Sequence, residues 1–208
     1  MVRRTAVVAR LVTAAALSVP FIVLASYPAH GQSQAGRTLV SHDFATSAQG
    51  WRISSDTGTT DPIFNSSGGS PGGCITGIDE AIGETWYFLA PGAVLQQLAA
   101  AENGTISFSL KQSTNVDGGF LDDDVVIVGT AGRIGYRFGF GSAPGTRWKE
   151  FFVRLSEGPG WRWNLGAPAT QAQIHSVLAA PLRLEIRGEY VTGPDEGALD
   201  NFILNAHE

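Results

Sequence analysis

Short segments with alternating hydrophobic and polar residues run along most of this chain, with turns rich in glycine and proline between them. Successive residues of a β-strand point to opposite faces, so each such segment is predicted to be a half-buried strand. Residues 105–111, 134–140 and 182–190 show this pattern. Their predicted inward-facing residues are Ile106, Phe108 and Leu110, then Ile134, Tyr136, Phe138 and Phe140, and finally Leu182, Leu184, Ile186 and Tyr190.

Further segments complete an all-β pattern. Residues 125–128 form a continuous apolar run, which is typical of a central strand covered on both faces. Another strand is predicted at Phe151, Val153 and Leu155, and residues 199–204 form the last one. Turn signals lie between the strands at residues 65–73, 143–145 and 158–160. Together these short strands and turns predict a two-sheet β-sandwich of jelly-roll type.

One or two short helices interrupt the strands. Thr170 is followed three positions later by Gln173, which is the spacing of a capping box at a helix start. After this cap, Ile174, Val177 and Leu178 fall on one helical face, which is expected to pack on the sandwich. A second short helix is predicted over residues 93–101.

The beginning of the chain has the features of a signal peptide. Arg3, Arg4 and Arg10 precede or open an apolar stretch over residues 11–24, and small residues occupy positions 29 and 31. Residues 1–31 are therefore predicted to be removed before Gln32, with cleavage after Ala35 or a retained membrane anchor as alternatives. The remaining chain, 32–208, is then one secreted or periplasmic domain with no transmembrane segment, because no second long apolar run follows.

Charge and cysteine usage narrow the function classes. The net charge is −5, and the only lysines are Lys111 and Lys149, so no basic stripe is available to neutralise phosphates. Nucleic-acid binding is therefore not expected. Cys74 is the only cysteine, which excludes a disulfide within one chain. We expect it to be a small, half-buried residue and not a nucleophile, with pairing between two chains left open.

A series of short motifs resembles one known family, the laminin IV type A (laminin B) domain. The motifs are Asp43-Phe44, Gln49-Gly50-Trp51, Gly72-Gly73, Trp86–Pro91, Gly104–Leu110, Asp124–Gly129, Pro144–Trp148, Val153–Leu155, Gly160-Trp161, Leu184–Tyr190 and Gly197–Asn201. The resemblance implies an extracellular jelly-roll sandwich, similar to carbohydrate-binding modules and galactose-binding-like domains. Laminins place this domain between cysteine-rich modules, which are absent here, and Cys74 stands where the family often has tyrosine.

The resemblance implies a binding or adhesion module, not an enzyme, with a glycan or an extracellular polymer or protein as partner. Stacking on a sugar needs aromatic faces beside polar groups. The predicted ligand-binding residues are Trp163, Trp161, Tyr190, Arg187 and Glu189. Trp163 is the first choice because packing explains it least. The alternative is a structural or protein-interaction module without a sugar site, in which these aromatic residues serve packing.

Catalysis is the least favoured class. Glu185 and Glu189 share a predicted strand face and could imitate the carboxylate pair of a polysaccharide-cleaving enzyme. However, Arg187 lies between them and Arg183 precedes them, so a ladder of cross-strand ion pairs explains the pattern more simply. No catalytic residues are therefore predicted.

Calcium is the one metal that the resemblance implies. Jelly-roll binding modules often hold a structural Ca²⁺ between an N-terminal loop and the last strand, through carboxylate and carbonyl oxygens. In this chain these positions correspond to Asp43 and Asp200, with carbonyl groups of residues 45–49. The alternative is that both aspartates fix turns through backbone hydrogen bonds.

Overall fold

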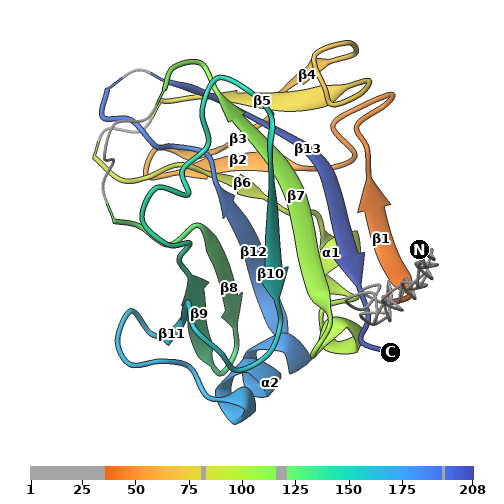
Figure 1. Cartoon of the computed structure of the whole chain (residues 1–208), viewed down its shortest axis with the longest axis vertical. Coiled ribbons are helices and arrows are strands. Elements are labelled where there is room, and N and C mark those ends of the chain that lie inside the picture. Colours follow the sequence, from red (N-terminus) through yellow and green to blue (C-terminus); the bar gives the residue numbers. More distant parts are fainter. Residues whose placement is uncertain (1–35, 81–82, 116–120, 194) are drawn as a thin grey trace, which may run out of the picture. The chain divides into compact units, whose positions relative to one another are not determined.

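Two antiparallel sheets make up the fold in the computed structural model, which describes residues 36–80, 83–115, 121–193 and 195–208 (Figure 1). The predicted signal peptide, residues 1–31, and both cleavage sites lie outside this part and stay predictions. Sheet A has the strand order β10 (Lys149–Arg154), β7 (Thr105–Gln112), β13 (Glu196–Asn205), β5 (Cys74–Ile78) and β4 (Ile63–Asn65), and β1 (Thr38–His42) also pairs with β13. Sheet B has the order β11 (Trp161–Trp163), β9 (Gly132–Tyr136), β8 (Val125–Gly129), β12 (Pro181–Arg187), β6 (Tyr87–Leu89), β2 (Arg52–Ser55) and β3 (Gly58–Thr60).

The two sheets enclose one hydrophobic core, which confirms the predicted β-sandwich. Strands β7, β8, β10 and β13 lie where the alternating and apolar segments predicted them. The inward side chains of β7 are Ile106, Phe108 and Leu110, all buried. β8 lies between β9 and β12, and its continuous apolar run is buried apart from Val128, as expected for a central strand. The long strand β13 pairs β7 on one side and both β5 and β1 on the other, with Thr38 opposite Asn205.

Two predicted strands depart from their alternating pattern, the first near its end and the second near its start. The strand over residues 134–140 stops at Tyr136, because the carboxylate of Asp124 accepts the Phe138 N–H (2.8 Å). Phe140, predicted to face inward, is fully exposed in the loop that follows. In the strand over residues 182–190, the pairing with β8 shifts between Pro181 and Arg183, which leaves Leu182 57% exposed instead of buried.

The capped helix is confirmed and the second helix is corrected. α2 (Gln171–Ala179) begins at Thr170, whose backbone N–H donates to Gln173 Oε1 (2.9 Å) while its hydroxyl accepts the Gln173 N–H (3.3 Å). Its three predicted inward residues are buried. The predicted helix over residues 93–101 is two separate pieces, α1 (Gly92–Leu95) and a 3₁₀ turn, η1 (Ala99–Ala101). No helix among the described residues is long and apolar enough to cross a membrane.

The ring of Trp86 joins the two sheets near one end of the sandwich. A Cβ added at Gly188, just after β12, would lie 1.9 Å from this ring, and one at Gly77 in β5 would lie 2.5 Å from it. Gly197 in β13 approaches the same ring. Glycine is therefore needed on both sheets for the ring to lie between them, and Trp86 is completely buried.

Cys74 is more deeply buried than predicted. Its side chain is 1% exposed and carries a free thiol, and burial raises the pKa of that thiol. The side chain lies under the loop formed by residues 65–73, where a Cβ on Gly68 would be 3.1 Å from the Cys74 sulfur. A thiol that is both covered and held in its protonated form is poorly placed to react with another chain.

Candidate functional site

The outer face of sheet B carries an unusual set of polar side chains. Leu184 and Ile186 of β12 point into the core, so Arg183, Glu185 and Arg187 point away from it. Tyr87 of β6 lies directly opposite Arg187 and therefore faces outward beside it. Although they face away from the core, Glu185 and Arg187 are buried, which means that neighbouring loops rise above this face.

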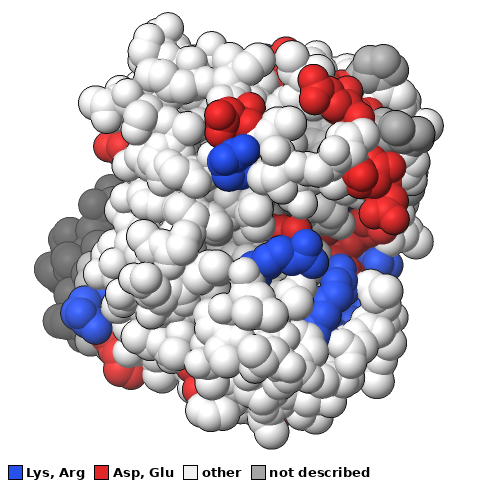
Figure 2. Space-filling view, turned by 180° about the vertical axis from the view of Figure 1, so that it is seen from behind, with Lys and Arg blue, Asp and Glu red and all other residues white. Residues whose placement is uncertain are grey.

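These loops and the sheet border an open hollow of about 770 Å³. Its lining residues, which define the hollow below, are Asp79, Gly83, Glu84, Thr85, Tyr87, Asp122, Arg133, Leu165, Glu189, Thr192 and Gly193. Figure 2, which views the molecule from behind the view of Figure 1, shows Lys and Arg side chains near the middle of this face and acidic side chains toward one rim. Tyr87 is the aromatic side chain in the lining, so the hollow combines one aromatic ring with charges of both signs.

A buried carboxylate holds two arginines at the β9 side of this face. Asp123 accepts from Arg133 at 2.7 Å and from Arg137 at 3.3 Å, and its own side chain is 1% exposed. Gly135 makes room for it, because a Cβ at that position would lie 2.0 Å from the carboxylate. Both arginine side chains remain partly exposed, although the Arg137 Nε is buried and has no hydrogen-bond partner among the described residues. Asp123 therefore fixes both arginines from below, while part of each side chain stays in contact with solvent.

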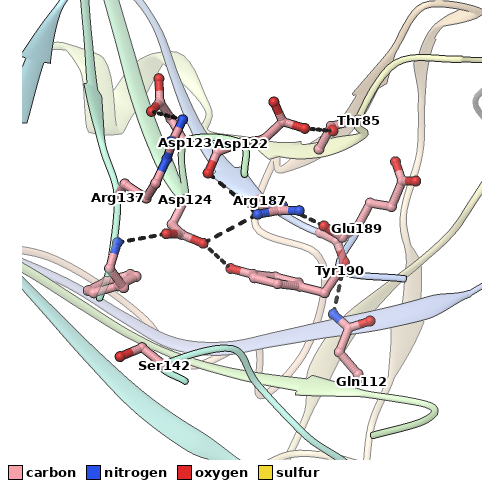
Figure 3. A network of polar contacts seen from close by, with 12 residues as sticks. Thr85, Gln112, Asp122, Asp123, Asp124, Arg137, Ser142, Arg187, Glu189 and Tyr190 are labelled. Carbon is pink, nitrogen blue, oxygen red and sulfur yellow. Dashed lines mark hydrogen bonds and ion pairs between the residues drawn. The ribbon is translucent and has the colours of Figure 1, made fainter. Parts of the chain in front are cut away.

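Below the hollow lies a second, buried network around Asp124 (Figure 3). One carboxylate oxygen accepts the Tyr190 hydroxyl (2.9 Å) and lies 3.8 Å from Arg187, while the other accepts the Phe138 N–H. Arg187 also donates to the Glu189 carbonyl (2.6 Å) and stacks on the Tyr190 ring. Burial raises the pKa of Asp124, and these hydrogen bonds and the arginine charge oppose that rise. The network fixes the end of β12 and the start of β8 to each other.

Glu189 connects the hollow with the Trp86 junction. Its carboxylate accepts the Trp86 N–H (3.2 Å), while the Trp86 indole N–H donates to Asp195 (3.2 Å). The side chain is 9% exposed, and burial, together with the charges of Asp79 and Asp195, raises the pKa of Glu189 to about 7. The charge of the hollow is therefore sensitive to pH near neutrality.

The charges of β12 do not form the predicted cross-strand ladder. Arg183 pairs with Glu185 of its own strand at 3.5 Å, and Arg187 turns toward Asp124. Glu185 is buried in the strand and burial raises its pKa, whereas Glu189 lies beyond the strand end and bonds Trp86. Glu185 and Glu189 therefore lie in different environments.

The structure divides the predicted ligand-binding residues. Arg187, Glu189 and Tyr190 lie together, but Arg187 and Tyr190 are buried in the network, and Glu189 alone of the five lines the hollow. Trp161 and Trp163 are on β11, which is separated from β12 by two strands. Their role in binding is a prediction that stays open, but their surroundings are those of packing residues.

The two tryptophans of β11 both face the core. Trp161 is 1% exposed, and its indole N–H donates to the Arg154 carbonyl (2.8 Å). Trp163 packs against the core and over Gly132, where a Cβ would lie 2.6 Å from the ring. Packing therefore accounts for part of the Trp163 side chain, and its role as the first-choice ligand residue stays a prediction.

Sequence reasoning missed Tyr87, Arg133 and Asp123. The alternation in residues 86–89 was available as a signal, because a buried Phe88 places Tyr87 on the opposite face. The link between Asp123 and its partners, Arg133 of β9 and Arg137 just after β9, depends on how the strands pair, and no local pattern reveals it.

The two predicted calcium ligands lie near each other at the bulge of β13. Asp200 is completely buried, and its two carboxylate oxygens accept the Ser70 and Asn201 N–H groups, both at 2.6 Å. Asp43 accepts the Ala45 N–H (3.1 Å), as a turn residue does. Burial raises the pKa of Asp200, and the charge of Asp43 raises it further. Among the described residues, no group of three or more His, Cys, Asp or Glu side chains is arranged to hold a metal.

Comparisons with known proteins agree with this architecture. The model of the family "Laminin B (Domain IV)" matches residues 87–207. The L4b domain of human laminin alpha-2 has a similar structure, with a TM-score of 0.60 and 13% identity over 75% of this chain and 90% of that domain. No curated protein matches the sequence.

Two carbohydrate-binding modules are more distant in structure. The xylan-binding domain CBM22-1 of Paenibacillus barcinonensis Xyn10C has a TM-score of 0.40 and 15% identity over 84% of this chain and 97% of that one. The family 11 module of Clostridium thermocellum Lic26A-Cel5E has a TM-score of 0.41 and 15% identity over 81% and 87%. The likeness to the laminin domain is one of fold.

Proposed function

This chain belongs to the laminin B (domain IV) family, and from that membership we propose that it is an exported, non-catalytic module that binds a glycan or another extracellular polymer. The proposed binding site is the hollow on the outer face of sheet B. The predicted signal peptide at residues 1–31 supports export. Mass spectrometry of the protein recovered from outside the cytoplasm is expected to show Gln32 as its first residue.

One observation carries the proposal: Tyr87 lines a hollow of about 770 Å³ beside hydroxyl, carboxylate and guanidinium groups. A pocket of this size is within the range that holds small ligands, and it accommodates a few sugar units. An aromatic ring can cover the apolar face of a sugar, while the polar groups bond its hydroxyls. The floor is fixed by the Asp123 and Asp124 networks, so little order has to be gained on binding.

The test is affinity electrophoresis of the purified protein in gels that contain soluble polysaccharides. We expect at least one polymer to retard the wild-type protein, Tyr87→Phe to keep most of the retardation, and Tyr87→Ala to lose it. Phe152→Ala is the matched control, because Phe152 is a 56% exposed aromatic residue on the outer face of sheet A. Unchanged retardation of Tyr87→Ala would move the site away from the hollow. A wild-type protein that no polymer retards would favour the structural or protein-interaction alternative.

We also propose that Asp43 and Asp200 hold a structural calcium ion. Two neighbouring carboxylates, one of them buried, repel each other, and within the described ranges no lysine or arginine forms an ion pair with Asp200. Backbone oxygens lie close by: a Cβ on Gly69 would be 2.7 Å from the Asp200 carboxylate and 2.0 Å from the Gly73 carbonyl. These oxygen donors suit a hard cation, which would neutralise the carboxylates and hold the 65–73 loop on β13.

Thermal unfolding in EDTA and then in added calcium tests this site. We expect the midpoint to rise with calcium in the wild-type protein and not in Asp43→Asn, which keeps the size of the side chain. An equal midpoint with and without calcium would leave the two aspartates as turn residues, held by the hydrogen bonds described above.

A further inference from the structure

Arginine side chains gather on the outer face of sheet B, although the chain as a whole carries a net charge of −5. Arg133 and Arg183 both lie opposite Val128 of β8, one on each side of it. Residues that pair across neighbouring strands share a face, so the two arginines flank the partly exposed Val128. Strand spacing puts their Cα atoms about 10 Å apart. Arg162 of β11 faces outward next to them, opposite Gly135.

The carboxylates below these arginines do not balance their charge. Asp123 forms ion pairs with both Arg133 and Arg137, and Glu185 forms one with Arg183 at 3.5 Å. Three guanidinium groups therefore share two buried carboxylates, which leaves this end of the face positive. The side chain of Arg183 is 52% exposed, and those of Arg133 and Arg137 remain partly exposed. Each guanidinium has five N–H donors, and these carboxylates use only some of them.

We propose that Arg133 and Arg183 bind an anionic group of the saccharide, a carboxylate or a sulfate; this rests on the function proposed above. A guanidinium fork matches two oxygens of such a group, and the buried carboxylates hold the forks in place beforehand. Arg133 is itself part of the lining of the hollow, so the anionic unit lies next to the unit that Tyr87 contacts.

The other charged residues that line the hollow limit where a bound saccharide can carry a negative charge. Asp79, Glu84, Asp122 and Glu189 line the same hollow, and their carboxylates repel an anion. A polymer with a negative charge on every unit would therefore meet both attraction and repulsion. The ligand that fits is a saccharide with an anionic unit at the arginines and an uncharged unit beside Tyr87.

The experiment compares the affinity of the purified protein for three probes at two salt concentrations. Partly methyl-esterified polygalacturonate supplies carboxylates that are separated by uncharged units, dextran sulfate of low substitution supplies sulfates in the same way, and neutral xylan supplies neither. We expect the charged probes to bind more tightly than xylan and to weaken as salt is added. Arg183→Gln is expected to lower the affinity for a charged probe about tenfold, as expected for the loss of a hydrogen bond to a charged group. Arg154→Gln, an exposed arginine on β10 of sheet A, is the matched control and is expected to change nothing.

The Glu84→Gln variant is expected to change the affinity for a charged probe in the opposite direction to Arg183→Gln, which makes the test more specific. Glu84 is an exposed carboxylate in the lining, so its removal is expected to strengthen the binding of a charged probe several-fold. Weaker binding in Glu84→Gln, or no effect of Arg183→Gln, would overturn the proposal. Binding of single-stranded DNA as tight as that of polygalacturonate would overturn the saccharide as ligand.

The failure of this inference can be distinguished from that of the proposed function. If xylan binds as tightly as polygalacturonate and Tyr87→Ala abolishes both, the hollow binds glycans and the anionic preference is wrong. If none of the three probes binds, the inference fails together with the glycan site.

Discussion

The outer faces of the two sheets differ in how their polar residues are covered. On sheet A, the loop of residues 65–73 lies over the strands: the Gly68 carbonyl accepts from Lys111 (3.5 Å) and from the Trp148 indole (3.2 Å), and Ser70 donates to Asp200. On sheet B the loops rise around the strands and leave a hollow. Both faces bury polar side chains, so burial of polar groups alone does not mark a binding site. The distinguishing feature is whether the chain's own backbone fills the space above them.

The largest expected effect comes from breaking the junction that both faces share. Trp86→Ala removes a ring that is completely buried between glycines of the two sheets and also ends the indole hydrogen bond to Asp195. Large-to-small changes of this kind cost about 3–5 kcal/mol in the free energy of unfolding. Urea denaturation measures this, and Trp86→Phe is expected to lose less. A loss below about 1 kcal/mol would mean that the sheets are joined elsewhere.

Gly73→Ala addresses the covered face alone. The new Cβ would lie 2.0 Å from the Phe44 carbonyl, so the backbone of the loop over sheet A has to move. We expect a loss of roughly 2–3 kcal/mol, in the upper part of the range for overpacking. Gly83→Ala at the rim of the hollow is the control, because no atom lies within 4 Å of its Cβ. Equal stability of the two variants would contradict the description of one face as filled and the other as open.

Asp123→Asn addresses the open face. The change leaves Arg133 and Arg137 without their shared charge partner, and both arginines are partly exposed, so water compensates for part of the loss. We expect a destabilisation of about 1–2 kcal/mol, below that of a fully buried pair. Asp61→Asn, which removes an exposed partner of Arg52, is expected to cost less than about 0.5 kcal/mol. If urea denaturation shows the same loss of stability for both variants, Arg133 and Arg137 are not fixed by Asp123.

The last prediction concerns pH dependence and not a loss of stability at one pH. The pKa of Glu189 is raised to about 7 from its usual 4.5, so its contribution to stability is complete below pH 4.5 and is lost as the pH rises through 7. Glu189→Gln cannot titrate, and its free energy of unfolding should fall less than that of the wild-type protein over this range. Parallel curves from urea denaturation at several pH values would show that Glu189 titrates normally.

The fold was largely predictable from the sequence because alternation reports which residues share a face. Alternation does not show whether a strand face that carries aromatic residues packs in the core or is open to a ligand. Trp161 and Trp163 illustrate this, because both were predicted as ligand-binding residues and both pack toward the core. The laminin B resemblance was confirmed, since motif order survives where identity is low.

The hollow was not predictable for a related reason. Its charges depend on pairs that are distant in sequence or that belong to adjacent strands, such as Arg133 and Arg183 on either side of Val128. Asp123 and Asp124 follow each other in the sequence, yet both are buried, and Asp123 pairs with Arg133 and Arg137 while Asp124 pairs with Arg187. Only the strand order brings these groups together.

The pairing of β1 with the end of β13 has a mechanical consequence. Thr38 lies opposite Asn205, so the chain enters and leaves these two strands at the same end. A pulling force applied through both strands would therefore open their hydrogen bonds one after another, as a zipper opens, and would not shear them all at once. A domain under tension through these two strands would extend by peeling β1 away at low force, while the network beneath the hollow, which does not include β1, remains folded.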